Sequence, residues 1–454
     1  MGMSSPARLT RRILEVPHKE RTAMDLSKFQ AARLIPATGI KGALDQERRV
    51  TSALLAVMRI VPDLAFSLLS GVKTPRGVVA SFIEPEFKLG KSAIRPDGLL
   101  ELSRGSRQWR ALVEVKTGSN DLDPAQITSY LDICRDHSFD ALITISNQVL
   151  NSSGDHPTTG IDQRKLRSTE LIHLSWLRVI TDCLILSEHQ GVEDREQAEV
   201  LKELIRFLQS DASGASEFND MGPSWASVRD GIRSGAITRP NEDLADVVSR
   251  YESLTRYAAL TLSARLGVSA KESVSKQALR DYKKHLADSC RTVIEKKELV
   301  GAITVPGSAS TLTMRADLAS GLLHCEFDLE APPDRSNKAR VSWVIRQLKA
   351  APDSVLVRWS YKRARAAEQP HELSNLRDSS YEFDLDKSRE VHLFRVEMVE
   401  KMGSKRGSGK GAFIDSVVDL YEKTYGEVLQ PVKAWARPAP KLSETVTDLM
   451  PDSA

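Results

Sequence analysis

The order of segments in the first 190 residues predicts an α/β fold with a mixed sheet flanked by helices. Two observations carry this prediction. A long apolar helical pattern is followed by three extended segments, and a second helix then precedes a further apolar strand. The chain has 454 residues with 41% hydrophobic and 28% charged side chains, which is the composition of a globular protein with room for two or three domains.

The elements of this first domain are expected in order between residues 41 and 186. The first helix has the apolar spacing of an amphipathic helix over residues 43–61, and Pro62 ends it. Residues 1–40 are basic and irregular, so we expect an N-terminal arm there. The remaining elements are strands at 78–89, 94–103, 108–116, 141–146 and 171–176, a helix at 124–136, and an apolar helix ending at 186.

The rest of the chain is expected to form a helical connector at 187–242 and a separate α+β domain at 243–436. The connector is charged and is broken at 211–216. A proline-containing tail follows at 437–454. Within the α+β domain, helices are expected at about 243–266, 272–298, 339–350 and 413–428, and strands at 301–305, 311–315, 322–327, 355–359 and 391–397.

Composition excludes several classes of protein. The four cysteines are far apart with no CxxC pair, which argues against zinc knuckles and a disulfide scaffold and favours a reducing compartment. No stretch approaches the ~18–20 apolar residues of a membrane span, so we expect a cytoplasmic protein without a membrane partner. The net charge is only +3, so any nucleic-acid site must be a local basic surface.

The strand at 108–116 places charge where packing favours apolar residues. Its alternation puts Leu112, Glu114 and Lys116 on one face. A solvated sheet face is the simpler interpretation of this strand taken alone. An acid two residues before a lysine also occurs at 86–88, 281–283 and 295–297, but the last two pairs lie in helical patterns.

A predicted hairpin distinguishes the pair Glu114 and Lys116 from the other acid–lysine pairs. Gly105 and Ser106 form a two-residue turn in which glycine supplies the positive φ of a type II′ turn. Pairing residue 104 with 107 then places Asp97 directly opposite Glu114. Like charges at that spacing are destabilising, so the pair needs a cation or a shared proton. A divalent metal ion is the economical explanation.

Three further residues are candidates for the same site. Glu47 lies on the apolar face of the first helix, although an acid near a helix start also suits the helix dipole. Gln126 and Tyr130 are four apart and share one face of the helix at 124–136. Gln126 has an alternative explanation, because Asp123 with Gln126 matches a capping box.

These residues together resemble the PD-(D/E)xK nuclease superfamily. Pro96-Asp97, sixteen intervening residues and Glu114-Val115-Lys116 match its core motif, and Glu47 matches the additional acid of many members. Gln126 and Tyr130 look like the QxxxY motif of the RecB-like branch. The resemblance covers about residues 40–150 and implies a restriction-endonuclease-like core.

The resemblance implies a metal-dependent nuclease, with DNA as the expected substrate. Mg²⁺ (or Mn²⁺) would be bound by Asp97, Glu114, the Val115 carbonyl and Glu47, and Lys116 would position or activate the attacking water. Gln126 and Tyr130 would contact the nucleic-acid backbone. The C-terminal domain would recognise the target, regulate the enzyme, form a homodimer or bind a protein partner, and family analogy suggests host defence or DNA processing.

Two other hypotheses stay open. The domain could be a catalytically silent nuclease-like module that binds nucleic acid or protein in a stress response, or its charges could form only a surface ion-pair network. A glycine-rich segment at 403–411 departs from a phosphate-binding loop, because Gly411 stands where Ser or Thr is required. We expect a basic loop there, and we expect His173 to be a hydrogen-bonded structural residue.

Overall fold

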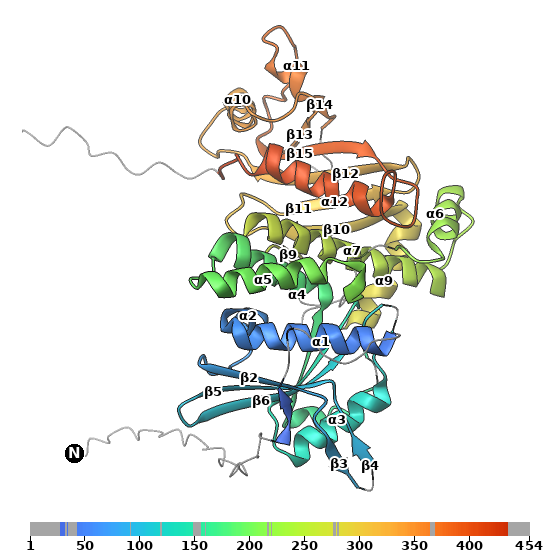
Figure 1. Ribbon diagram of the computed structural model, residues 1–454. Helices are drawn as coiled ribbons and strands as arrows, with labels where there is room; N and C mark the ends of the chain where they lie inside the picture. Colours follow the sequence, from blue (N-terminus) through green and yellow to red (C-terminus); the bar gives the residue numbers. More distant parts are fainter. Residues whose placement is uncertain are drawn as a thin grey trace, which may run out of the picture.

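The computed structural model describes residues 28–31, 34, 43–90, 92–118, 120–148, 156–158, 160–215, 218, 220–275, 278, 281–363 and 368–434. Most of the expected N-terminal arm and the whole expected tail lie outside these residues. Figure 1 shows that the elements stack in layers, from α3 through a first sheet, α1, α4 with α5, and α7 to a second sheet.

The N-terminal half is a mixed six-stranded sheet flanked by helices, as predicted. Its strand order is β1-β2-β5-β6-β7-β8, with parallel pairing only between β6, β7 and β8. The elements are β1 Gln30–Ala31, α1 Ala43–Ile60, α2 Pro62–Leu68, β2 Val78–Ile83, β3 Phe87–Leu89, β4 Ser92–Ile94, β5 Gly98–Arg104, β6 Arg107–Val115, α3 Pro124–Asp136, β7 Ala141–Ser146, β8 Glu170–Ser175 and α4 Trp176–Ile185.

Three predicted elements of this half differ in detail. Pro62 does not only end α1 but also begins α2, because a missing N–H is harmless in the first helical turn. The strand expected at 78–89 divides at Glu84-Pro85-Glu86 into β2 and β3, and the one at 94–103 divides at Pro96-Asp97 into β4 and β5. Proline interrupts a strand because it has no amide to donate. The expected arm contributes the edge strand β1.

The C-terminal half contains a seven-stranded antiparallel sheet of order β14-β13-β15-β12-β11-β10-β9. Of the helix expected at 272–298, the structure shows α9 from Tyr282 to Lys296, and residues 271–272 join the sheet instead. The elements are α5 Arg195–Leu208, α6 Trp225–Ser234, α7 Glu242–Leu266, β9 Lys271–Glu272, α9 Tyr282–Lys296, β10 Glu298–Thr304, β11 Leu312–Asp317, β12 Leu322–Glu330, α10 Asn337–Gln347, β13 Leu356–Tyr361, β14 His371–Glu372, α11 Leu373–Arg377, β15 Val391–Lys401 and α12 Phe413–Lys423.

Three apolar cores hold these layers together. The first sheet buries one face under α1 and α4, with α5 packed on those helices in the same core, and its other face under α3. The second sheet packs against α6, α7, α10 and α12. The segment expected as a connector therefore contributes to two cores, since α5 packs with the first sheet and α6 with the second.

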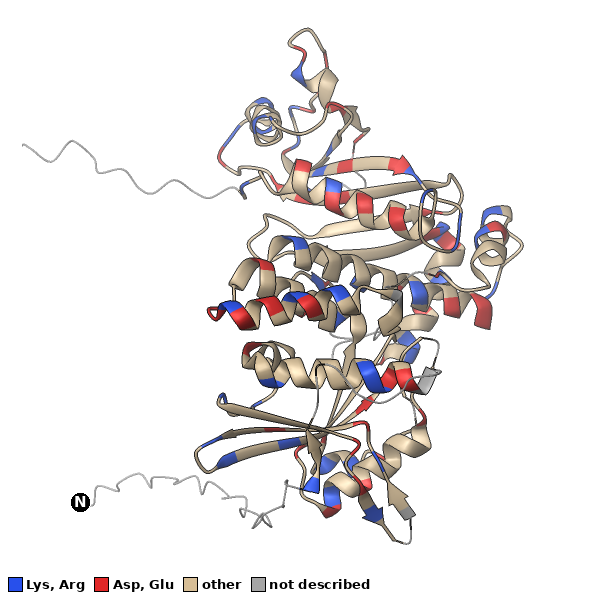
Figure 2. Ribbon diagram, viewed as in Figure 1, with Lys and Arg blue, Asp and Glu red and all other residues tan. Residues whose placement is uncertain are grey.

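Charged residues of both signs are interspersed over most elements (Figure 2). Within the described residues, no single helix is long and apolar enough to cross a membrane. The bent pair Asp45–Ile60 and Pro62–Leu68 passes that test together, by length and composition only, and the middle of α1 is buried in the first core.

Candidate functional site

The predicted hairpin register is correct. Arg104 pairs with Arg107 across the turn, Gly105 has a φ of +60°, and Gly98 pairs with Val113. Asp97 precedes Gly98 and therefore lies beside Glu114. The amide of Val115 donates a 2.7 Å hydrogen bond to Oδ2 of Asp97. Because the N–H and C=O of one strand residue face the same side, the Val115 carbonyl is expected to point to the side of β6 on which Asp97 lies.

Lys116 lies among the acids. Its Nζ is 2.7 Å from Oε1 of Glu114 and 3.7 Å from Oε2 of Glu47. Glu114 is 1% exposed and Glu47 is 5% exposed. The alternative of a solvated strand face is therefore wrong, because both carboxylates are out of water. Buried carboxylates of this kind need a compensating positive charge, and the Lys116 ammonium supplies part of that charge.

The carboxylates of Asp97 and Glu114 are held closer than their charges favour. Burial raises the pKa of Asp97 well above its usual value, and the neighbouring Glu114 carboxylate raises it further. Oε2 of Glu114 is buried and has no hydrogen-bond partner among the described residues. An acceptor without a donor, next to a second acid, fits a site for a cation with hard oxygen ligands.

Glu47 is placed differently from the other two acids. Its Oε1 accepts hydrogen bonds from the Thr117 amide at 3.3 Å and from the Asn120 side chain at 2.7 Å. Among the described residues, no three His, Cys, Asp or Glu side chains form a group that could hold a metal ion. The expectation that Glu47 is itself a metal ligand therefore rests on the family resemblance alone.

Gln126 and Tyr130 face this site from α3. Nε2 of Gln126 donates to the Tyr130 hydroxyl at 2.7 Å. Asp123 caps α3 through the Ala125 amide, so the capping-box explanation of Gln126 is not what the structure shows. Burial and the nearby Glu114 raise the pKa of the Tyr130 phenol, which stays a neutral hydrogen-bond donor beside the acids.

Contacts that the sequence did not predict hold the backbone after β6. The Trp176 indole donates to the Lys116 carbonyl at 2.9 Å. The segment after α5 packs here too, because the Gly118 amide donates to Gly214 and Asn147 donates to the carbonyls of both glycines. These three partners come from separate parts of the chain, so no local pattern marks them.

The rival pair at 86–88 lies outside the site. Glu86 forms an ion pair with Arg95 at 2.5 Å, and both side chains are about half exposed. Glu84 forms a surface ion pair with Arg48. Its own amide donates to the Asp97 carbonyl at 3.0 Å, and its φ of +48° marks a strained backbone beside the site. Glu84 thus borders the site, as a support for Asp97.

A polar row continues from the site across the sheet. Glu114 pairs with Thr144 on β7, and Thr144 pairs with His173 on β8. The Thr158 amide donates to Nδ1 of His156, so Nε2 of that ring carries the proton and donates to Thr144. The Thr144 hydroxyl then donates to Nδ1 of His173, whose Nε2–H donates to the Gln148 carbonyl. The prediction that His173 is a hydrogen-bonded structural residue is confirmed.

This histidine pair makes stability depend on pH. Burial lowers the pKa of both His156 and His173 to about 4, whereas an unfolded histidine titrates near 6.5. The unfolded state therefore binds more protons between these values, and we expect the free energy of unfolding to fall as pH falls from 6.5 to 4. The loss is roughly 3 kcal/mol per imidazole at most.

Urea denaturation at several pH values measures this effect. A His173→Gln variant should lose about half of the pH dependence. A His392→Gln variant changes an exposed histidine on β15 and should leave the profile as it is. A wild-type profile that is flat from pH 6.5 to 4 would contradict the assignment.

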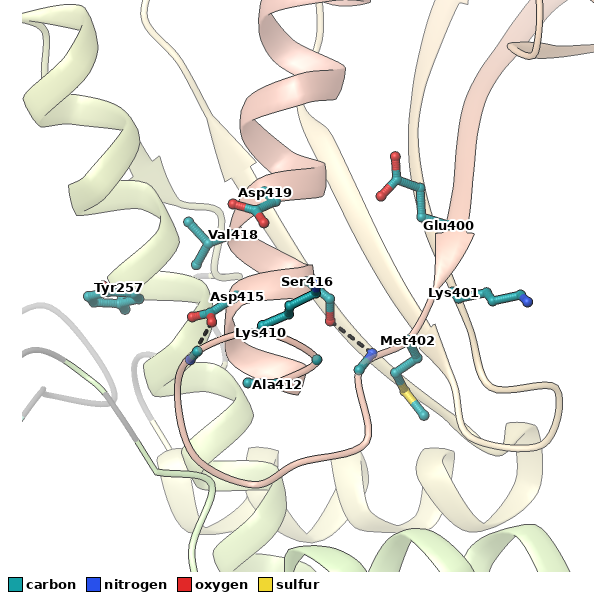
Figure 3. A pocket seen from close by; sticks show the side chains of 13 residues that line it. Tyr257, Glu400, Lys401, Met402, Lys410, Ala412, Asp415, Ser416, Val418 and Asp419 are labelled. Atoms are coloured by element: carbon teal, nitrogen blue, oxygen red, sulfur yellow. Dashed lines mark hydrogen bonds between the residues drawn. The ribbon is translucent and has the colours of Figure 1, made fainter.

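The glycine-rich loop at 403–411 borders a pocket of about 680 Å³ between the end of β15 and the start of α12 (Figure 3). Its Gly409 amide donates to the Asp415 carboxylate at 2.5 Å. Glu400 and Asp419 also line the pocket, and burial with the charge of Asp415 raises the pKa of Asp419. Carboxylates already face the loop, so this pocket is not suited to a phosphate.

Comparison of the chain with family models, with curated protein sequences and with solved structures finds no match to any of them.

Proposed function

We propose that the chain is a metal-dependent nuclease with a restriction-endonuclease-like core, which hydrolyses phosphodiester bonds with DNA as its expected substrate. The observation that carries the proposal is the buried Asp97–Glu114 pair beside Lys116, in which Oε2 of Glu114 lacks a partner among the described residues. Burying two adjacent acids is unfavourable unless they bind a cation or share a proton, and the unpartnered Oε2 of Glu114 favours the cation.

Asp97, Glu114 and the Val115 carbonyl would hold the ion. Carboxylate and carbonyl oxygens suit Mg²⁺ or Mn²⁺, the metals expected from the sequence. When bound, such an ion lowers the pKa of water and stabilises negative charge on the phosphoryl group. The acids supply the ligands, and the rigid β5–β6 hairpin fixes the spacing between them.

Lys116 would stabilise the charge that develops on the substrate. Burial opposes its own charge, but Glu114 and the other two acids outweigh that effect and raise the pKa of Lys116. The ammonium is therefore protonated at neutral pH and acts as a hydrogen-bond donor, so it orients the attacking water without removing a proton from it. Glu47 would position Lys116 through their 3.7 Å contact.

The test is a cleavage assay with Mg²⁺ or Mn²⁺ on duplex DNA, single-stranded DNA and RNA. Compared with the wild type, Asp97→Ala and Lys116→Ala should each lower the rate by about 10²–10³-fold or more, because each removes stabilisation of the transition state. Glu86→Ala is the matched control. It removes the acid of the rival pair on the surface and should keep full activity.

A silent nuclease-like module is the second candidate function. The observation in its favour is that Lys116 already contacts both Glu114 and Glu47 and so partly neutralises the acids without a metal ion. Binding of nucleic acid by the wild type without cleavage of any of the three substrates would favour this module over the nuclease.

A further inference from the structure

A second polar pocket, of about 640 Å³, lies at the start of α10 in the C-terminal half. It is formed by the first turn of that helix and by the segment 383–390, which precedes β15. Ser336 caps the helix through the Ala339 amide. The first turn of this eleven-residue helix therefore borders a concave surface, and helix N-termini carry partial positive charge.

Cations predominate around this pocket. Five basic side chains line it against two acidic ones, Asp384 and Glu390. Figure 2 shows basic residues on α10 and on the loop beside it. The basic residues are Arg335, Lys338, Arg340, Lys387 and Arg389.

Three of these cations are available to a ligand. Arg335, Lys338 and Lys387 are exposed, and no hydrogen bond or ion pair of their side chains is found within the described part of the chain. Other exposed cations, such as Lys202 with Glu199, have their charge matched by a neighbouring acid. Several like charges around one concavity are unfavourable unless an anion neutralises them.

The pocket also has a rigid, buried base. Arg340 is only 3% exposed and is held by the carbonyls of Val391 and Pro333 and by Glu390. Its Nε is buried and has no acceptor among the described residues. Arg389 is fixed at the rim, with its guanidinium 4.6 Å from the centre of the Tyr361 ring.

We propose that this pocket binds a phosphate group carried by a nucleotide or by a nucleic-acid strand. The helix start and the three available cations match the charge of a phosphate, and the Nε–H of Arg340 is a donor that lacks an acceptor within the described residues. Phe383 on the wall offers an apolar surface for a base. The inference that the phosphate belongs to a nucleic acid rests on the proposed function, whereas the inference that the pocket binds a phosphate group does not depend on it. This pocket is the local basic surface that the small net charge requires of a nucleic-acid-binding protein.

The experiment measures binding without cleavage. The full chain carrying Asp97→Asn is titrated in EDTA with a labelled single-stranded DNA, with and without a 5′ phosphate, and separately with AMP. A second variant carries Asp97→Asn together with Arg335→Ala and Lys387→Ala. It should bind the DNA, AMP or both at least about fivefold more weakly than Asp97→Asn alone. For this single-stranded DNA, the slope of log affinity against log salt should become shallower by about 0.7 for each phosphate that the variant no longer neutralises.

The control is the pair Lys283→Ala and Lys284→Ala in the same background, which removes equal charge from exposed positions of α9. It should leave binding within about twofold. If the pocket variant binds AMP and the 5′-phosphorylated DNA more weakly, the pocket is a site for a terminal phosphate or a mononucleotide. If it binds only the DNA more weakly, with or without the 5′ phosphate, the pocket is a site for the backbone of a strand. Unchanged binding of every probe by the pocket variant would overturn the proposal, and it would leave the cleavage result untouched.

Discussion

Replacing Asp97 with asparagine is expected to raise the thermal stability of the metal-free protein and to remove at least about 99% of metal-dependent cleavage. The carboxylate is destabilising in the fold, because burial and Glu114 raise its pKa. Asparagine keeps an oxygen that can accept the hydrogen bond of the Val115 amide, yet it carries no charge. We expect a gain of about 0.5–2 kcal/mol, the usual size of a single stabilising substitution.

The sign of this effect depends on pH. A carboxyl whose pKa is raised by folding binds its proton more tightly in the folded state, so the wild type loses stability as pH rises through the folded pKa. The advantage of the Asp97→Asn variant should therefore grow as pH rises through the folded pKa of Asp97 and vanish at acid pH, where Asp97 is protonated.

Thermal melts in EDTA at several pH values, together with the cleavage assay, measure both effects. Glu86→Gln neutralises an exposed acid and should change neither stability nor activity measurably. Adding Mg²⁺ should raise the melting temperature of the wild type more than that of the variant, because only the wild type keeps both acidic ligands. A variant that melts below the wild type at neutral pH would contradict the interpretation of the acid pair.

The second large effect concerns the buried ion pair between Glu101 on β5 and Arg110 on β6. These residues pair across the hairpin, with Nε of Arg110 2.5 Å from Oε2 of Glu101, and both side chains are at most 10% exposed. Arg110→Met should lower the free energy of unfolding by about 3–5 kcal/mol, because it leaves the Glu101 carboxylate buried without a cation.

Urea denaturation tests this expectation with two companion variants. The double variant Glu101→Leu with Arg110→Met removes both charges and should recover most of the loss, since the pair itself contributes little net stability. Arg48→Met breaks the exposed ion pair with Glu84 and should cost no more than about 1 kcal/mol. An Arg110→Met variant that is destabilised by less than about 1 kcal/mol would show that Glu101 finds another partner.

The parts of the site that were predictable are those that depend on neighbours in the sequence. The Gly105 turn and the alternation of β6 place Asp97 beside Glu114 without reference to the rest of the fold. The α3 helix is similarly local, because Asp123 and Pro124 begin it where expected. The hydrogen-bond partner of the Gln126 side chain could not be predicted from nearby residues. Both the Tyr130 hydroxyl and the backbone amide at the start of the helix lie within its reach.

By itself, the sequence determined the α/β class, the hairpin register and the residues of the acidic pair. Those features follow from turn geometry and from periodicities of 2 and 3.6 residues, which act over a few positions. Only the tertiary structure decided that Glu47 contacts Lys116, that Trp176 and Gly214 hold the chain after β6, and that a basic pocket forms at α10. Such contacts join residues that are distant in the sequence, such as Glu47 and Thr117, which are 70 positions apart, and the packing of whole layers brings them together.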